Sequence, residues 1–168
     1  MEHGYSRIVL MGVPGTGKTT IGRALSRATG LRYLDGDAMH TGRALQRMAE
    51  GVPLGDEDCW PWLVRVGNAL SNPPLIAGCS TLKRSYRDLL RSIAGPIAFV
   101  HLTGAPAVIA RRMHGRPSPS MPADLARQFA DLQPPEPDEQ SLTIDIDQPL
   151  EVIVANIQAA MGFAPASR

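Results

Sequence analysis

The sequence predicts a single α/β domain built on a parallel β-sheet that helices cover on both faces. Three observations support this fold class. The chain has 168 residues, which is one domain's worth, and its 43% hydrophobic content is enough for a full core. Five short apolar runs alternate with segments of helical spacing, a pattern typical of a parallel sheet buried on both sides. We therefore treat residues 1–168 as one domain, with its ligand site at the carboxyl ends of the strands.

The strand segments are short apolar runs bounded by turn-forming or polar residues. The first is the run R-I-V-L-M and the third is P-L-I-A-G. In chain order, we expect strands at residues 7–11, 31–34, 74–78, 97–102 and 142–146.

Apolar spacing and boundary residues identify the helical segments. Ile21, Leu25 and Ala28 repeat on one side of the first, and Gly30 then favours a left-handed helix end. In chain order, we expect helices at 18–29, 38–50, 56–70, 82–92, 106–113 and 149–161. Two Pro-rich segments interrupt the alternation, and we interpret residues 115–122 as a mobile loop and 133–141 as a connector.

Charge and cysteine content exclude several classes of function. The 17 basic and 16 acidic residues give a net charge of +1, which argues against a nucleic acid or a membrane surface as the main partner. Cys59 and Cys79 lack metal-binding spacing, so we expect neither a disulfide scaffold nor a zinc site, and a reducing, cytoplasmic location fits. The start is not leader-like, and no apolar run nears the roughly 20 residues of a membrane span. Lys18 and Lys83 are the only lysines beside 15 arginines.

Residues 12–19, G-V-P-G-T-G-K-T, match the phosphate-loop pattern G-x-x-x-x-G-K-[ST] between a strand and an amphipathic helix. Backbone N–H groups of such a loop hold phosphate oxygens, and the helix dipole adds favourable potential. We expect Lys18 to reach the β- and γ-phosphates and the Thr19 hydroxyl to ligate Mg²⁺. The pattern predicts a nucleoside triphosphate site formed by Gly12, Pro14, Gly15, Thr16, Gly17, Lys18, Thr19 and Thr20.

Two carboxylates follow the second strand, in the run Asp35-Gly36-Asp37. Both can face the phosphate loop if Gly36 relaxes the backbone. One carboxylate can hold a Mg²⁺-bound water, and the other can orient and deprotonate an attacking hydroxyl. The alternative is an acidic turn that caps the next helix, which Asp37 could do alone. A switch GTPase is not indicated, because the chain lacks the N-K-x-D motif.

Several runs resemble the small phosphate-loop gluconate kinases, or gluconokinases, which are related to shikimate kinase and the nucleoside monophosphate kinases. They are L-M-G-V-P-G-T-G-K-T-T, Y-L-D-G-D-A-M-H, R-M-A-E-G-V-P-L-G-D-E-D, P-W-L, C-S-T-L-K-R-S-Y-R-D-L-L-R and D-I-D-Q-P-L-E. The resemblance spans about residues 8–157. It implies the sheet order 2-3-1-4-5, a lid at roughly 112–131 and a tendency to form homodimers. It also implies transfer of the ATP γ-phosphate to the 6-hydroxyl of the sugar acid D-gluconate.

The resemblance implies roles for five residues on the acceptor side. Asp37 would take the proton of the acceptor hydroxyl, and Asp35 would support the water shell of Mg²⁺. His40 would bind hydroxyls of the sugar acid. Lys83 and Arg87 would face the acceptor or the transferring phosphoryl group.

On the nucleotide side, Arg112 and Arg116 would clamp the phosphates. The adenine would lie near Arg112 and the loop before Pro149. For Arg87, Arg112 and Arg116, the alternative is an ordinary solvated helix surface. We interpret Trp62 as a core residue rather than a stacking platform.

The sequence departs from the family pattern mainly on the acceptor side. The family's Asn is Ala44, its Arg is Cys59, and its His-Phe pair in the lid is Pro119-Ser120. A lost hydrogen bond to a charged group is worth about 1.5–3 kcal/mol, roughly 10- to 150-fold in affinity. Arg127 could compensate by holding the substrate carboxylate. Two alternatives stay open: a kinase of another sugar acid, sugar or cyclitol, and a weakened ATP-binding regulatory protein.

Overall fold

The computed structural model describes residues 6–73, 75–113 and 122–163, and five strands in this part of the chain form one parallel sheet. The strand order is β2-β3-β1-β4-β5, as expected. Val9 of the central strand lies opposite Ala77 on one side and Phe99 on the other. The strands are β1 (Arg7–Met11), β2 (Arg32–Asp35), β3 (Leu75–Gly78), β4 (Ala98–Thr103) and β5 (Ser141–Asp145).

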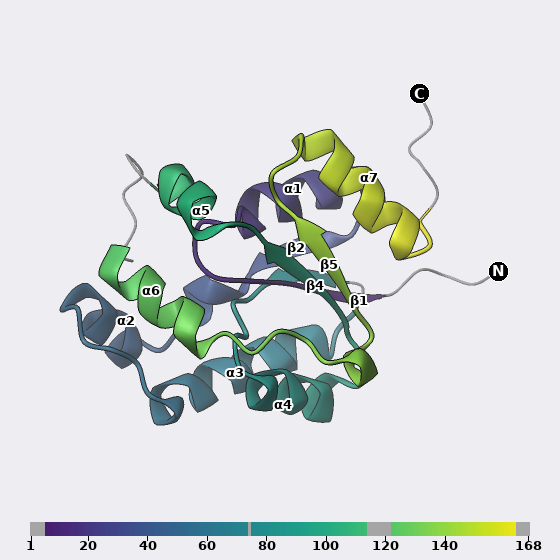
Figure 1. Cartoon of the computed structure of the whole chain (residues 1–168). Helices are drawn as coiled ribbons and strands as arrows, with labels where there is room; N and C mark the ends of the chain where they lie inside the picture. The colour runs from purple at the N-terminus through teal and green to yellow at the C-terminus, as the bar shows by residue number, and fades with distance from the viewer. Residues whose placement is uncertain (1–5, 74, 114–121, 164–168) are drawn as a thin grey trace.

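Helices cover both faces of this sheet. Figure 1 shows α1 (Lys18–Thr29) and α7 (Leu150–Ala160) on one face, with α3 (Asp56–Leu70) and α4 (Arg84–Ala94) on the other. The predicted α/β fold class is therefore confirmed. The remaining elements are α2 (Gly42–Ala49), α5 (Pro106–Met113), α6 (Pro122–Asp131) and the short 3₁₀ helices η1 (Gly36–Met39) and η2 (Pro137–Glu139).

The central strand β1 contributes side chains to two hydrophobic cores. Ile8 and Leu10 pack into the core beneath α1 and α7, whereas Val9 and Met11 pack into the core beneath α3 and α4. All four side chains are fully buried. Each buried aliphatic side chain of this size contributes about 1.5–3 kcal/mol. Both cores therefore fix β1, and with it the start of the loop that follows.

Most predicted elements are confirmed, with bounds that agree or shift by one or two residues. The prediction of one helix over 38–50 is wrong, because the segment divides into η1 and α2. His40 has extended backbone angles (φ −55°, ψ 149°), and the Thr41 hydroxyl caps α2 by accepting from the Ala44 amide at 3.2 Å. A threonine hydroxyl at this position starts a new helix rather than continuing the old one. The last helix begins at Leu150, with Pro149 as its cap.

The two Pro-rich segments contain structure that the sequence did not indicate. Residues 137–139 of the predicted connector form η2, and Glu139 in it is buried. Pro122, at the end of the predicted loop 115–122, begins α6. The rest of that loop lies outside the described residues.

Candidate active site

The loop between β1 and α1 has the geometry of a phosphate-binding turn. The backbone at Gly17 is left-handed (φ 90°), and this residue caps α1. A Cβ on Gly12 would lie 2.6 Å from the Leu102 carbonyl oxygen, so only glycine fits there. The Thr16 hydroxyl donates to the Val13 carbonyl at 3.0 Å and closes the loop. The left-handed glycine, the close approach to β4 and the Thr16 contact therefore give this loop the tight turn that the sequence pattern predicts.

Lys18 places its ammonium group inside this loop. The residue is 8% exposed. Its Nζ donates to the carbonyl oxygens of Gly12 at 2.9 Å and Val13 at 3.4 Å. It also lies 3.5 Å from Oδ2 of Asp37. The structure thus brings together two of the predicted catalytic residues.

The carboxylate of Asp37 accepts hydrogen bonds from Ser80, which lies two residues after the neighbouring strand β3. The Ser80 amide donates to Asp37 Oδ1 at 3.0 Å, and the Ser80 hydroxyl lies 3.2 Å from Oδ1 and 3.1 Å from Oδ2. Asp37 follows β2 and Ser80 follows β3, and these strands are adjacent. The capping alternative for Asp37 is wrong, because α2 is capped by Thr41. Ser80 is a site residue that sequence reasoning missed.

Gly36 has a different role from the one expected. Its backbone is not left-handed, so conformational freedom is not what the position requires. A Cβ there would lie 2.6 Å from the Gly78 carbonyl oxygen. Glycine is needed because η1 passes directly against the end of β3. This close approach brings Asp37 to Ser80, while Asp35 is exposed at the end of β2.

His40 lies against the indole ring of Trp62. The two rings stack with centroids 4.1 Å apart and an interplanar angle of 19°. Trp62 is 3% exposed, and its indole N–H donates to the Gly36 carbonyl at 2.7 Å, so its predicted core position is confirmed. Burial lowers the pKa of His40, although the nearby Asp37 carboxylate acts in the opposite direction. Among the described residues, the buried His40 Nδ1 has no hydrogen-bond partner.

Lys83 belongs to a polar cluster at the start of α3 and α4. Its Nζ donates to Asp56 Oδ1 at 2.9 Å, and the Tyr86 hydroxyl donates to the same oxygen at 2.5 Å. Hydrogen bonds from Tyr86 and Lys83 lower the pKa of Asp56. Cys59, one helical turn after Asp56, is buried beside this cluster. Lys83 keeps 32% of its side chain exposed, so it is accessible to a ligand.

The prediction that Arg87 binds the acceptor is wrong. Its side chain has no exposed surface and therefore cannot contact a ligand. Its Nε and Nη2 donate to the two carboxylate oxygens of Glu139 at 2.7 and 3.0 Å. Its Nη1 donates to the carbonyls of Thr81 at 3.0 Å and Leu82 at 3.2 Å. The alternative of a solvated surface is also wrong, because a carboxylate 52 residues further along the chain covers this arginine.

The predicted neighbourhood of Arg112 and the loop before Pro149 is present. Arg112 Nη2 donates to the Ile146 carbonyl at 2.7 Å. A hollow of about 250 Å³ lies here, lined by Val108, Arg111, Arg112 and Asp147. Arg116, Pro119 and Ser120 lie outside the described residues.

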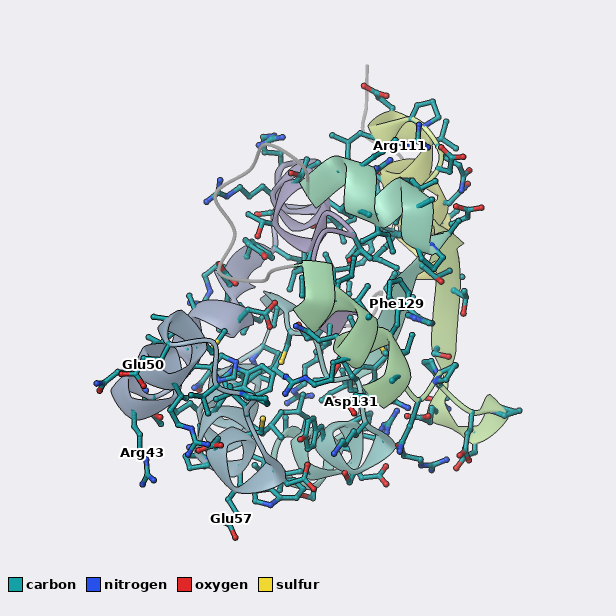
Figure 2. The ribbon with its side chains drawn as sticks, turned by 60° about the vertical axis from the view of Figure 1, so that its left-hand side comes forward. Arg43, Glu50, Glu57, Arg111, Phe129 and Asp131 are labelled. Carbon is teal, nitrogen blue, oxygen red and sulfur yellow. The ribbon has the colours of Figure 1, made fainter. Side chains whose placement is uncertain are left out.

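Arg127 lies on α6 and is half-buried. Figure 2 shows the same helix with Phe129 directed toward the body of the molecule, whereas Arg43, Glu50 and Glu57 point outward. Phe129 packs against the core beneath α1 and α7. This contact holds α6 against the body of the molecule.

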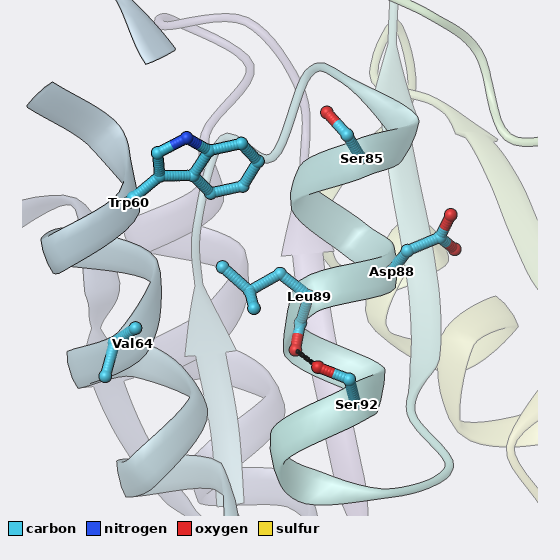
Figure 3. Close-up of a pocket in the computed structure, with 6 residues that line it drawn as sticks. All are labelled: Trp60, Val64, Ser85, Asp88, Leu89 and Ser92. Carbon is cyan, nitrogen blue, oxygen red and sulfur yellow. Dashed lines mark hydrogen bonds between the residues drawn. The ribbon is translucent and has the colours of Figure 1, made fainter. Parts of the chain in front are cut away.

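A larger hollow of about 590 Å³ lies between the outer surfaces of α3 and α4. Figure 3 shows the apolar side chains of Trp60, Val64 and Leu89 facing it, with Ser85, Asp88 and Ser92 at its edge. It is lined by no residue of the phosphate loop, η1 or the Lys83 cluster. Among the described residues, this hollow is therefore separate from the phosphate loop and from the Lys83 cluster.

Comparison with known proteins agrees with this geometry. The family model described as shikimate kinase matches residues 14–58. The thermoresistant gluconokinase of Escherichia coli (strain K12) is 38% identical over 162 residues, which cover 92% of this chain and 93% of that protein. The gluconokinase of Gluconobacter oxydans (strain 621H) is 35% identical, with 89% and 88% covered.

Solved structures show the same similarity. The crystal structure of a gluconokinase from Sinorhizobium meliloti 1021 has a TM-score of 0.88 and 41% sequence identity, and the match covers 96% of this chain and 94% of that one. A shikimate kinase from Acinetobacter baumannii, solved with shikimate, has a TM-score of 0.63 and 20% identity, which shows a shared fold. No helix in the described part of the chain is long and apolar enough to cross a membrane.

Proposed function

The chain belongs to the gluconokinase family, and from this premise we propose that it transfers the γ-phosphate of ATP to D-gluconate, giving ADP and 6-phosphogluconate. The observation that carries the proposal is the contact of Lys18 and Ser80 with Asp37 at the phosphate loop. This constellation unites a phosphate-binding cation with a carboxylate that can act as a general base.

The residues of the loop fit a nucleoside triphosphate with Mg²⁺. The Lys18 ammonium is buried on two carbonyl oxygens and one carboxylate, where added phosphate oxygens would meet a fixed positive charge. Thr19 would ligate the metal, and Asp35 would hold one of its waters. Bound Mg²⁺ neutralises charge on the β- and γ-phosphates. Arg112 and the hollow it lines would receive the adenine end of ATP.

Asp37 is the proposed base. Ser80 donates to both of its oxygens, so the carboxylate keeps one orientation and needs no rearrangement when the acceptor arrives. In this orientation Asp37 would accept the proton of the gluconate 6-hydroxyl as that oxygen attacks the γ-phosphorus. Lys18 would stay with the phosphate oxygens, where negative charge is redistributed.

The acceptor would lie against the stacked rings of His40 and Trp62. His40 would bind hydroxyl groups, and Lys83 would approach the acceptor from the start of α4. The part of the lid that the structure describes comprises the end of α5 and all of α6, and we propose that residues 112–131 close over the site. Arg116 would then contact the transferring phosphate, and Arg127 would hold the carboxylate of the sugar acid.

The experiment that tests the function is ADP release measured with ATP, Mg²⁺ and a panel of gluconate, other sugar acids, sugars, cyclitols and shikimate. We expect turnover with gluconate that is lost in Lys18→Ala and in Asp37→Ala. Turnover with a different acceptor would replace gluconate as the substrate. ATP binding without turnover on any acceptor would support a regulatory protein instead.

A further inference from the structure

Arg87 lies directly behind the loop that carries Ser80. Its guanidinium group donates to the carbonyl oxygens of Thr81 and Leu82, which are the two residues that follow Ser80. The Leu82 carbonyl also accepts from the Gln133 amide at 2.8 Å. The loop is therefore attached from behind to α4 and to the connector that precedes β5.

A buried carboxylate fixes the direction of the arginine. Glu139 has no exposed side-chain surface and binds Arg87 through both of its oxygens. Arg91 donates to Glu139 Oε1 at 3.0 Å, and the Glu136 amide donates to Oε2 at 2.7 Å. A bidentate pair of planar groups allows little rotation. The guanidinium therefore has one orientation, with Nη1 directed at the loop.

The loop adopts a conformation that it would not choose by itself. Thr81 has φ of 35°, in the left-handed region that a β-branched residue disfavours. Such a conformation persists only when the surroundings determine it. On the side of the phosphate loop, the Cys79 amide donates to the Leu10 carbonyl at 3.0 Å and the Gly12 amide donates to the Ser80 carbonyl at 3.3 Å. On the opposite side, Arg87 holds the Thr81 carbonyl itself.

We propose that Arg87 and Glu139 are positioning residues for phosphoryl transfer. Their ion pair holds Thr81 in its left-handed conformation, which presents the Ser80 amide and hydroxyl to the carboxylate of Asp37. The inference rests on the proposed function, since Asp37 is the base of that reaction. Loss of the arginine would leave the ATP site in place and misalign the base. A misplacement of about 1 Å costs about 100-fold in rate.

The test compares Arg87→Lys with Arg91→Gln as a matched control. The lysine keeps a positive charge beside Glu139 but has no fork that reaches both loop carbonyls. The control substitution removes Arg91, which also donates to Glu139. It leaves in place the hydrogen bonds from Arg87 to the Thr81 and Leu82 carbonyls. We expect kcat of Arg87→Lys to fall about 10- to 100-fold while KM for ATP changes less than about threefold. In the control, Arg87 and the Glu136 amide still hold both carboxylate oxygens of Glu139, so both values should stay within about threefold of wild type. If Arg87→Lys does not fold, Glu139→Gln takes its place.

A second measurement does not depend on the acceptor. Hydrogen exchange of the Cys79 and Ser80 amides should become faster in Arg87→Lys than in Arg91→Gln, while the amides of β1 stay protected. Equal exchange of residues 79–83 in the two variants, or equal kcat values, would overturn the proposal. If the wild-type protein does not phosphorylate gluconate, the proposed function fails, and the exchange comparison still decides whether Arg87 holds the loop.

Discussion

The amide and the hydroxyl of Ser80 both donate hydrogen bonds to the carboxylate of Asp37. Asp37 lies two residues after β2 and Ser80 two residues after β3, and the two are 43 residues apart in sequence. The contact joins two strand ends beside the phosphate loop, and it orients the carboxylate before any substrate binds. Several consequences of this arrangement can be measured.

Replacement of Ser80 by alanine removes the hydroxyl and keeps the amide donor. Because one hydrogen bond to a charged group is worth about 1.5–3 kcal/mol, we expect kcat with gluconate to fall roughly 10- to 150-fold. KM for ATP should change little, because the contact of Ser80 with the phosphate loop is made by its backbone carbonyl, which accepts from the Gly12 amide. Steady-state kinetics of Ser80→Ala and Ser80→Thr check this. The threonine variant keeps a hydroxyl and should retain more activity. Equal rates for wild type and alanine variant would show that the hydroxyl does not orient Asp37.

Arg112 should affect nucleotide binding rather than the chemical step. It lines the hollow beside Asp147 and donates to the Ile146 carbonyl. In Arg112→Ala we expect KM for ATP to rise about 5- to 50-fold with kcat changed less than about threefold. Arg43→Ala is the matched control, because Arg43 is exposed on α2 and points outward in Figure 2. A fall in kcat with constant KM would assign Arg112 to the transition state instead.

Two buried histidines should make the fold sensitive to mild acid. Burial lowers the pKa of His40 and of His101, and Arg87 lowers that of His101 further. The unfolded chain, with histidine pKa values near 6.5, therefore binds protons that the native state does not. The free energy of unfolding should decrease as pH falls below about 6.5, and the whole histidine contribution should be lost below the native pKa values.

Burial raises the pKa of Glu139, but hydrogen bonds from Arg87, the Glu136 amide and Arg91 outweigh it and lower that pKa to about 2.

The measurement is the melting temperature between about pH 7.5 and about pH 5.5. His40→Phe keeps an aromatic ring on Trp62 and removes one of the two titrating groups. Its melting temperature should depend less on pH than that of the wild type. An unchanged slope would mean that His40 takes up no proton on unfolding.

Neither cysteine should react in the native protein. Cys59 is 7% exposed and Cys79 is fully buried, and both are free thiols. Burial raises the pKa of each thiol, so the reactive thiolate is scarce at neutral pH. A thiol reagent should label both cysteines in denaturant and neither without it. Labelling of native Cys59 would show that the first turn of α3 opens to solvent.

The sequence by itself determined the fold class, the phosphate loop and the places of the five strands along the chain. Helix 18–29 and strand 7–11 were predicted with the bounds that the structure has, because local apolar spacing and glycine ends specify them. The pattern around Lys18 is local in the same sense, since the strand, the loop and the helix are consecutive. The sheet order followed from the resemblance of the whole chain to the gluconokinases, not from any single segment.

Tertiary structure decided which polar residues meet. From the sequence, Arg87 is expected to bind a ligand. In the structure it binds Glu139, a carboxylate 52 residues away in a segment expected to be a connector. Ser80 lies in the family-like run C-S-T-L-K-R-S-Y-R-D-L-L-R, but that run assigned it no contact. Its contact with Asp37 appeared only when β2 and β3 paired and Gly36 allowed their ends to approach. Burial and long-range pairing are properties of the packed chain. A pattern of neighbouring residues does not encode them directly. The sequence therefore predicted where the candidate site lies, whereas the tertiary structure decided which side chains meet there.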